Sequence, residues 1–210
     1  MKEKIMKKKI LAIGNYADAM YHSFTGVDER LKQILSDYEL ACTDDTSAFL
    51  TLNEHNFSGV ISYLDIWNSK LSDDEAAALE KFVTNGGAAL LLHNGISIQS
   101  QPTLLQLAGG KFLGHPQHEV IRFVPTTHPI TIGCDSFSLD EEPYQLELVS
   151  DDKEIILTYW YKNKEYPAGW CKMAGTGRLV YLCPGHTPEI FDCPQYQKLI
   201  RQSMAWILGE

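Results

Sequence analysis

AALLLHNGI occupies residues 88–96, and its first five residues are apolar without a polar interruption. The run is entered from two glycines at 86–87 and is left through His93, Asn94 and Gly95. A short apolar run between turn signals is typical of a strand buried on both faces, although periodicity alone also fits a buried helix segment. The flanking residues favour the strand. Ligands of open α/β sheets bind outside the carboxyl ends of the strands, so His93 is the first candidate for chemistry.

Strand and helix patterns alternate on the amino-terminal side of this run. Strands are predicted at 9–13, 38–42 and 57–64, with helices at 27–35 and from Ser72 to Asn85. Ser72 and Glu75 form a capping-box sequence at the start of the second helix, with two further acidic residues between them. This order predicts a parallel sheet built by right-handed crossovers.

The carboxyl-terminal half has shorter elements. A helix is predicted at 102–107, a glycine-rich functional or covering loop at 109–118, a strand at 119–124 and irregular structure at 126–144. Four short strands follow at 145–149, 155–161, 167–172 and 178–183, and the final helix spans 194–208. The predicted fold class is therefore α/β, with a mostly parallel sheet that gains antiparallel strands in this half. No linker or repeat divides residues 1–210, so we expect a single domain.

Composition narrows the range of partners. The net charge is −9 and no basic stripe is present, which disfavours nucleic acid as a partner. Residues 1–9 are basic, but the apolar run at 10–13 is too short for a signal peptide or a membrane span. The five cysteines are odd in number and lack C-x-x-C spacing, so neither a disulfide framework nor a zinc knuckle is indicated. We expect a protein of the cytoplasm with a small-molecule ligand, and a homo-oligomer is left open.

Histidines recur at predicted strand exits and in long loops. They are His22, His93, His115 with His118, and His186, while Asp140, Glu141 and Glu142 form an acidic loop. If the fold brings these loops together, the pocket can perform acid/base chemistry or bind a divalent metal. The spacing is not diagnostic, and the plain alternative is that each histidine caps or hydrogen-bonds its own loop. His55 and His128 do not follow strands, and we interpret them as structural.

Other residue types give weaker signals. Trp67, Trp160 and Trp170 are candidate stacking platforms for a sugar, although packing in the core or at an edge explains any one of them. A glutamine amidohydrolase needs a nucleophilic cysteine at the turn after the central strand. Residues 92–95 are LHNG, so that thiol is absent, and Cys183 is better explained as a buried strand residue.

Taken together, several segments resemble the ThuA-like family, the trehalose-utilisation proteins. The amino-terminal matches are Tyr21-His22, Leu71-Ser72, Gly86-Gly87, Leu92-His93, the segment 107–115, His128-Pro129-Ile130 and Glu141-Glu142-Pro143-Tyr144. The more specific carboxyl-terminal matches are PAGW at 167–170, GTGRLVY at 175–181, Gly185-His186 and Trp206. The resemblance covers nearly the whole chain. The chain is short for the family, and Glu141 stands where an aspartate is usual.

The resemblance implies a three-layer, flavodoxin-like fold of the class I glutamine amidotransferase type, without the amidotransferase cysteine. It also implies a pocket formed by His22, His93, His115, Glu142 and His186, and an association with the metabolism of small sugars and keto-sugars.

Our leading hypothesis is an enzyme of carbohydrate metabolism without amidotransferase activity. Its catalytic groups would be His93, His186 and Glu142. The substrate-binding groups would be His22, His115, Tyr144, Trp67 and Asn94. No cofactor is fixed by the sequence, but a divalent metal ion is the candidate, with His22, His93, His115, His186 and Glu142 as its possible ligands. The alternative is a non-catalytic sugar-binding or regulatory module.

Overall fold

A nine-stranded sheet runs through the protein in the order β2-β1-β3-β4-β11-β10-β9-β6-β7. The computed structural model describes residues 7–210, so most of the predicted basic leader at 1–9 lies outside the described residues. The strands of this sheet are β1 (Lys9–Gly14), β2 (Glu39–Thr43), β3 (Phe57–Tyr63), β4 (Ala88–Leu92), β6 (Glu119–Pro125), β7 (Phe137–Glu141), β9 (Lys153–Tyr161), β10 (Lys164–Ala174) and β11 (Gly177–Leu182). A second, two-stranded sheet pairs β5 (Gly110–Gly114) with β8 (Gln145–Leu148).

The first five strands of that order pair in parallel, and the fourth of them is β4, all of whose residues are buried. Its neighbours are β3 and β11, which cover both of its edges. The buried strand predicted from the apolar run at 88–92 is confirmed. Because parallel strands point the same way, the loops after β1, β3, β4 and β11 all lie at one edge of the sheet.

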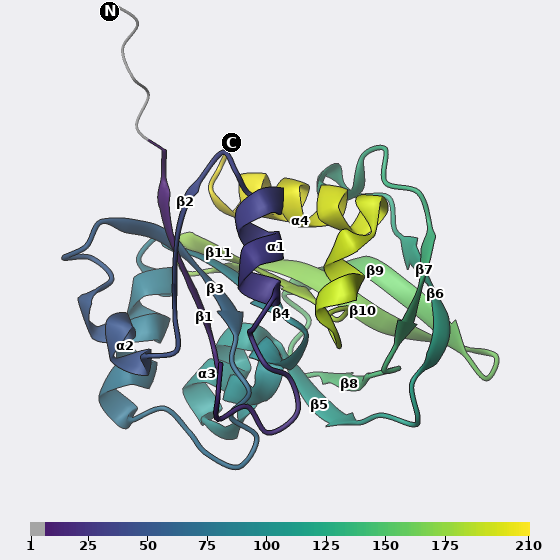
Figure 1. Ribbon diagram of the computed structural model, residues 1–210, viewed down its shortest axis with the longest axis horizontal. Helices are drawn as coiled ribbons and strands as arrows, with labels where there is room; N and C mark the ends of the chain where they lie inside the picture. The colour runs from purple at the N-terminus through teal and green to yellow at the C-terminus, as the bar shows by residue number, and fades with distance from the viewer. Residues whose placement is uncertain (1–6) are drawn as a thin grey trace, which may run out of the picture.

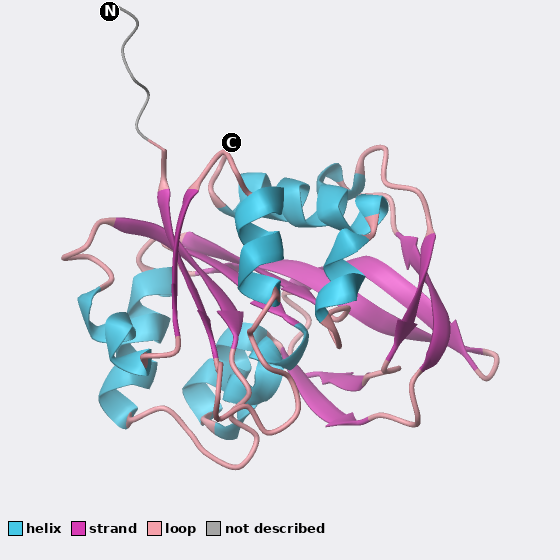
Figure 2. Cartoon of the chain, viewed as in Figure 1, coloured by secondary structure: helices cyan, strands magenta, loops and turns pink. Residues whose placement is uncertain are grey.

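Helices cover both faces of the sheet (Figure 1). The α-helices are α1 (Val27–Ile34), α2 (Asp73–Thr84), α3 (Pro102–Ala108) and α4 (Pro194–Ile207). Short 3₁₀ helices are η1 (Thr46–Thr51), η2 (His93–Ser100), η3 (Pro129–Thr131) and η4 (Pro188–Asp192). α1 packs beside α4 and α2 packs beside α3, which gives the three layers of a doubly wound fold (Figure 2). The apolar stripe of α4 is buried as predicted, including Tyr196, Leu199 and Met204.

The capping box predicted for α2 is present. The Glu75 amide donates to the Ser72 hydroxyl at 3.2 Å, and the Ser72 amide donates to the Glu75 carboxylate at 2.7 Å. Two amides that the first turn would leave unpaired are thereby satisfied. The helix therefore begins where the sequence predicts.

The antiparallel strands β10, β9, β6 and β7 extend the sheet beyond β11, in agreement with the predicted additions (Figure 1). Two predictions in this half are wrong. Residues 110–114 form β5 where a loop is predicted, and residues 137–141 form β7 where irregular structure is predicted. Both strands are set by pairing with distant segments, β8 and β6, and such partners leave little trace in the local sequence.

Within residues 7–210, none of the helices combines the length and the apolar character that crossing a membrane requires.

Candidate functional site

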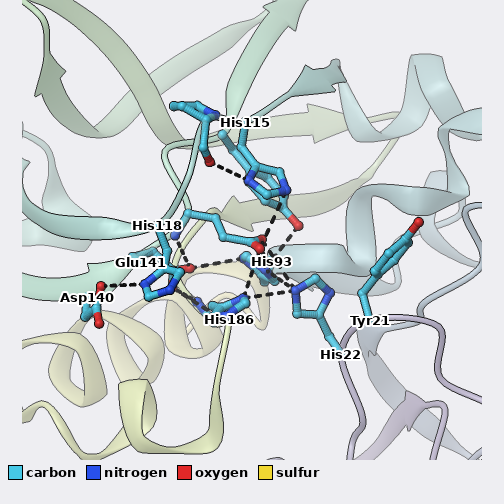
Figure 3. Close-up of polar contacts among 12 residues, drawn as sticks. Tyr21, His22, His93, His115, His118, Asp140, Glu141 and His186 are labelled. Carbon is cyan, nitrogen blue, oxygen red and sulfur yellow. Dashed lines mark hydrogen bonds and ion pairs between the residues drawn. The ribbon is translucent and has the colours of Figure 1, made fainter.

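Three histidines lie at the carboxyl edge of the parallel strands, each directly after a strand or in the loop that follows it. His93 follows β4 directly, His22 lies in the loop after β1, and His186 lies in the loop after β11. Their rings point toward one another although they are far apart in the sequence (Figure 3). Glu142 follows β7 directly, and the alternating antiparallel pairs from β11 to β7 make β7 run the same way as β4, so its carboxyl end lies at the same edge. The tertiary structure therefore brings four predicted site residues into one cluster, which we call the central cluster: His22, His93, Glu142 and His186.

The distances in the central cluster are short. His22 Nε2 lies 3.1 Å from His186 Nδ1 and 3.3 Å from His93 Nε2. Glu142 Oε2 lies 3.4 Å from the Nε2 atoms of both His22 and His93, and its Oε1 lies 3.2 Å from His186 Nδ1. One potential ligand atom from each residue lies within 4.8 Å of all the others.

The tautomer of His93 is fixed by its surroundings. Its Nδ1 lies 2.7 Å from the Cys183 carbonyl oxygen, which can only accept, so Nδ1 carries the proton. Burial lowers the pKa of His93 to about 4, against the opposing effect of Glu142, and the ring is therefore neutral near pH 7. The lone pair of Nε2 consequently faces the central cluster, where the Tyr144 hydroxyl donates to it at 3.0 Å.

The backbone at His93 is also unusual. Its φ of +46° lies in the left-handed region, which non-glycine residues rarely adopt. Gly185 packs against it, and a Cβ at position 185 would lie 2.7 Å from the His93 Cβ. Strained backbone of this kind gathers at functional sites, where the surrounding structure holds it.

Glu142 is ionised within this cluster. Burial would raise the pKa of its carboxyl, but the contacts with His186 and then His22 outweigh burial and hold the pKa well below its usual range. The same interaction with Glu142 raises the pKa of His186. Glu142 Oε2 is nevertheless buried without a hydrogen bond of good geometry. A buried carboxylate oxygen with no such partner, beside unprotonated imidazole nitrogen, suits a bound cation.

A cavity of about 390 Å³ opens beside the central cluster. Its lining residues are Tyr21, His22, Trp67, Phe112, Gly114, His115, Glu142 and Tyr144. The rings of Trp67 and Phe112 lie 4.8 Å apart, and those of Phe112 and Tyr144 lie 4.3 Å apart. Aromatic rings and ionisable groups thus both line the cavity, and its volume falls within the roughly 300–1,000 Å³ typical of small-ligand sites.

Two of the predicted site residues, His115 and Asn94, lie outside the central cluster. His115 lines the cavity with its Nε2 3.6 Å from Glu142 Oε1, and it lies outside the group of four possible ligands. Asn94 is fully buried and donates to the Tyr63 carbonyl at 2.9 Å, so it ties η2 to β3 and does not line the cavity.

The sequence model of the ThuA family, described as trehalose utilisation, matches residues 15–207. This chain belongs to the ThuA family. The match spans all the residues of the central cluster and of the cavity wall. No curated protein matches the chain.

Solved ThuA-like structures share the fold of this family member. A ThuA-like protein from Bacteroides uniformis ATCC 8492 superposes with a TM-score of 0.77 at 20% identity, covering 97% of this chain and 92% of that one. A second, from Parabacteroides merdae ATCC 43184, gives a TM-score of 0.79 at 16% identity, covering 96% of this chain and 90% of that one. The GH42 beta-galactosidase Gan42B gives a TM-score of 0.64 at 12% identity, covering 96% of this chain and 30% of that one. At these identities the likeness shows the flavodoxin-like fold alone.

Two carboxylates of this ThuA-family site were not among the predicted site residues. Asp65 follows β3 and accepts hydrogen bonds from the amides of Tyr21 and His22. Glu141 ends β7 and accepts hydrogen bonds from the amides of Gly185 and His186. The position of Asp65 at a strand exit was a usable signal. Nothing local separates Glu141 from its neighbour Glu142, because only the fold shows which of the two faces the backbone amides.

A second group within residues 7–210 has the spacing of metal ligands. This peripheral cluster comprises His128, Glu154 and Cys171. His128 Nε2 lies 3.5 Å from Cys171 Sγ and 3.8 Å from Glu154 Oε2. Burial raises the pKa of the Cys171 thiol to about 12. His128 Nδ1 accepts a hydrogen bond from the Ile130 amide, which caps η3.

Proposed function

We propose that this ThuA-family protein is a metal-dependent enzyme that acts on a small neutral sugar or keto-sugar. The observation that carries the proposal is the meeting of three imidazoles and one ionised carboxylate beside an aromatic-walled cavity. The family's description, trehalose utilisation, supports a carbohydrate as the substrate class.

The donor set supports a divalent transition metal. His22, His93, His186 and Glu142 would hold it, since imidazole nitrogen with one carboxylate oxygen suits Zn²⁺ and its neighbours in the first transition series. The unprotonated His93 Nε2 and the unsatisfied Glu142 Oε2 are the two atoms that best fit such an ion. Such an ion supplies Lewis-acid polarisation of a substrate oxygen and lowers the pKa of a bound water.

The cavity wall supports a sugar ring as the ligand. Trp67, Phe112 and Tyr144 present aromatic faces against which the apolar face of a sugar can pack. Glu142, His22 and His115, which line the same cavity, offer hydrogen-bond partners for its hydroxyl groups.

His115 is the group best suited to move a proton. Its Nδ1 lies 2.8 Å from the Pro116 carbonyl oxygen, so Nδ1 carries the proton and the lone pair of Nε2 is free. Nε2 is on the cavity side, 3.6 Å from Glu142 Oε1, and about a third of the side chain is exposed. In the proposed reaction His115 accepts a proton from the carbon next to a carbonyl or from a hydroxyl group, and Glu142 stabilises the imidazolium that forms.

The proposal is tested with protein stripped by a chelator and reloaded with Zn²⁺, Mn²⁺ or Co²⁺. Each form is incubated with neutral disaccharides and keto-sugars, and the products are analysed. We expect turnover that depends on the metal, and His115→Gln should lower it by about 10²- to 10⁴-fold without loss of metal. The matched control is His55→Gln, an exposed histidine away from the site, which should leave turnover unchanged.

Two results would contradict the proposal. If the protein retained no metal after reloading, the metal would have no part in the mechanism. Sugar binding without chemical change in every metal form would favour the non-catalytic binding module.

We also propose that the protein works in a reducing compartment such as the cytoplasm. All five cysteines are free, and the three that are only partly buried would be open to oxidation elsewhere.

A further inference from the structure

Two loop histidines of the central cluster are held in the same way, by a buried carboxylate that binds backbone amides. Asp65 Oδ2 accepts from the amide of His22 at 2.7 Å and from the amide of the residue before it, Tyr21, at 2.6 Å. Glu141 Oε2 accepts from the amide of His186 at 3.0 Å and from the amide of the residue before it, Gly185, at 2.6 Å. In both cases a single oxygen binds the histidine and its predecessor.

Both carboxylates connect a second strand to the histidine loop. Asp65 follows β3 and fixes the loop after β1, and its own amide donates to Asn15 Oδ1 at 2.8 Å. Glu141 ends β7 and fixes the loop after β11, and its Oε1 accepts from the Glu142 amide at 2.8 Å. Glu141 therefore contacts the backbone of two members of the central cluster. Asp65 is 5% exposed and Glu141 is fully buried, so water does not compete with these bonds.

The hydrogen bonds from these carboxylates matter for His22 and His186 because regular secondary structure does not hold either residue. His93 follows directly on the buried strand β4, whereas His22 and His186 lie in loops without regular structure at those residues. Their ring nitrogens nevertheless lie 3.1 Å apart. One buried carboxyl oxygen accepts from two consecutive amides in each loop, so each side chain can fix a loop that lacks regular backbone pairing.

We infer that Asp65 and Glu141 are positioning residues, which set the separation of His22 and His186 and thereby the fit of the central cluster to a cation. The inference rests on the proposed function for its ligand, but the positioning itself exists without metal. Neither carboxylate is one of the four possible cation ligands or lines the cavity, and each would act through the backbone of a histidine.

The two carboxylates differ in a way that sharpens the test. Asp65 Oδ1 is buried without a hydrogen-bond partner. Asp65→Asn can therefore keep an accepting oxygen at the Oδ2 position and put its amide nitrogen at the Oδ1 position, where no hydrogen bond is broken. Asp65→Glu keeps the charge but moves the oxygen by one methylene. Both oxygens of Glu141 already accept from amides, so the side-chain NH₂ group of Glu141→Gln must face a backbone N–H group. Glu141→Asp has a side chain shorter by one methylene, which moves both oxygens away from the amides.

The experiment measures Zn²⁺ affinity by chelator competition on the full chain, together with the histidine ring resonances of metal-free protein by ¹⁵N NMR. Positioning predicts that Asp65→Asn binds Zn²⁺ within about threefold of wild type, whereas Asp65→Glu, Glu141→Asp and Glu141→Gln bind about 10- to 100-fold more weakly. The His22 resonances should move in Asp65→Glu and stay in Asp65→Asn. The matched control is Asp28→Ala, which removes another buried carboxylate that accepts from a backbone amide, at Gly26, and should lower the Tm without changing Zn²⁺ affinity.

If Asp65→Asn bound Zn²⁺ weakly and Asp65→Glu bound it with wild-type affinity, the positioning role would be overturned, because the charge at position 65 alone would then explain the result. Wild-type affinity in all four variants, whatever their Tm, would reduce the two carboxylates to structural residues. If wild-type protein takes up no Zn²⁺, the proposed function fails separately, and the resonances decide the inference: unmoved His22 signals in Asp65→Glu would overturn it.

Discussion

The central and peripheral clusters both gather side chains at metal-ligand distances, yet their chemistry differs. In the central cluster His93 Nδ1 donates to a carbonyl oxygen, so its Nε2 is unprotonated and has a lone pair. In the peripheral cluster His128 Nδ1 accepts from the Ile130 amide, so the proton of its neutral ring sits on Nε2, between Glu154 and Cys171.

The other ligands differ as well. Glu142 is nearly buried and its pKa is held low by the histidines around it, whereas Glu154 is 76% exposed and solvated. Cys171 would have to become a thiolate, but burial raises its pKa to about 12. Proximity alone therefore does not make a metal site, because the hydrogen bond on the far nitrogen of each imidazole decides whether the near nitrogen can bind.

The largest effect that separates the clusters should come from His93→Asn. Asparagine tolerates the left-handed backbone found at this position but cannot supply the imidazole nitrogen. We expect Zn²⁺ affinity to fall by at least about 100-fold, since even residues that only support a ligand cost 10- to 100-fold. Chelator competition measures it, and unchanged affinity would remove His93 from the proposed site.

His128→Ala should affect stability and leave metal binding alone. Its Nδ1 caps η3, and loss of such a cap costs about 0.5–2 kcal/mol of unfolding free energy. His128→Asn loses the same packing but can still cap, so the difference between the two variants in urea unfolding isolates the cap. A fall in Zn²⁺ stoichiometry in either variant would show that the peripheral cluster also binds metal.

Tyr144→Phe should raise Zn²⁺ affinity about 3- to 10-fold. In the free protein the Tyr144 hydroxyl donates to the lone pair of His93 Nε2 that the cation requires, and a net hydrogen bond of about 0.5–1.5 kcal/mol competes with binding. Calorimetric titration compares the two proteins. Weaker binding by the variant would mean that the hydroxyl supports the bound state.

The smallest effect is expected for Cys171→Ala. The thiol is buried and protonated at neutral pH, so its removal should change Zn²⁺ affinity by less than about twofold. Elemental analysis of the purified variant checks the stoichiometry. A loss of bound metal would contradict the assignment of Cys171 to simple packing.

The sequence determined the framework of this protein. The apolar run of β4, the capping box of α2 and the alternation of strands with helices follow local rules, and each is present in the structure. Local rules failed at β5 and β7, because a short strand paired with a distant partner owes its existence to that partner. His22, His93 and His186 could be singled out in advance because strand exits of a parallel sheet converge.

Only the tertiary structure decided how these residues are used. It showed that Glu142 faces the imidazoles, whereas Glu141, one residue earlier in the chain, faces backbone amides. It placed Asp65 within hydrogen-bond distance of the His22 amide, and it left His93 Nε2 unprotonated while the equivalent atom of His128 carries the proton. Such differences depend on which backbone group lies within about 3 Å of a side chain. That distance is set by the packing of strands far apart in the chain, and residue type does not encode it.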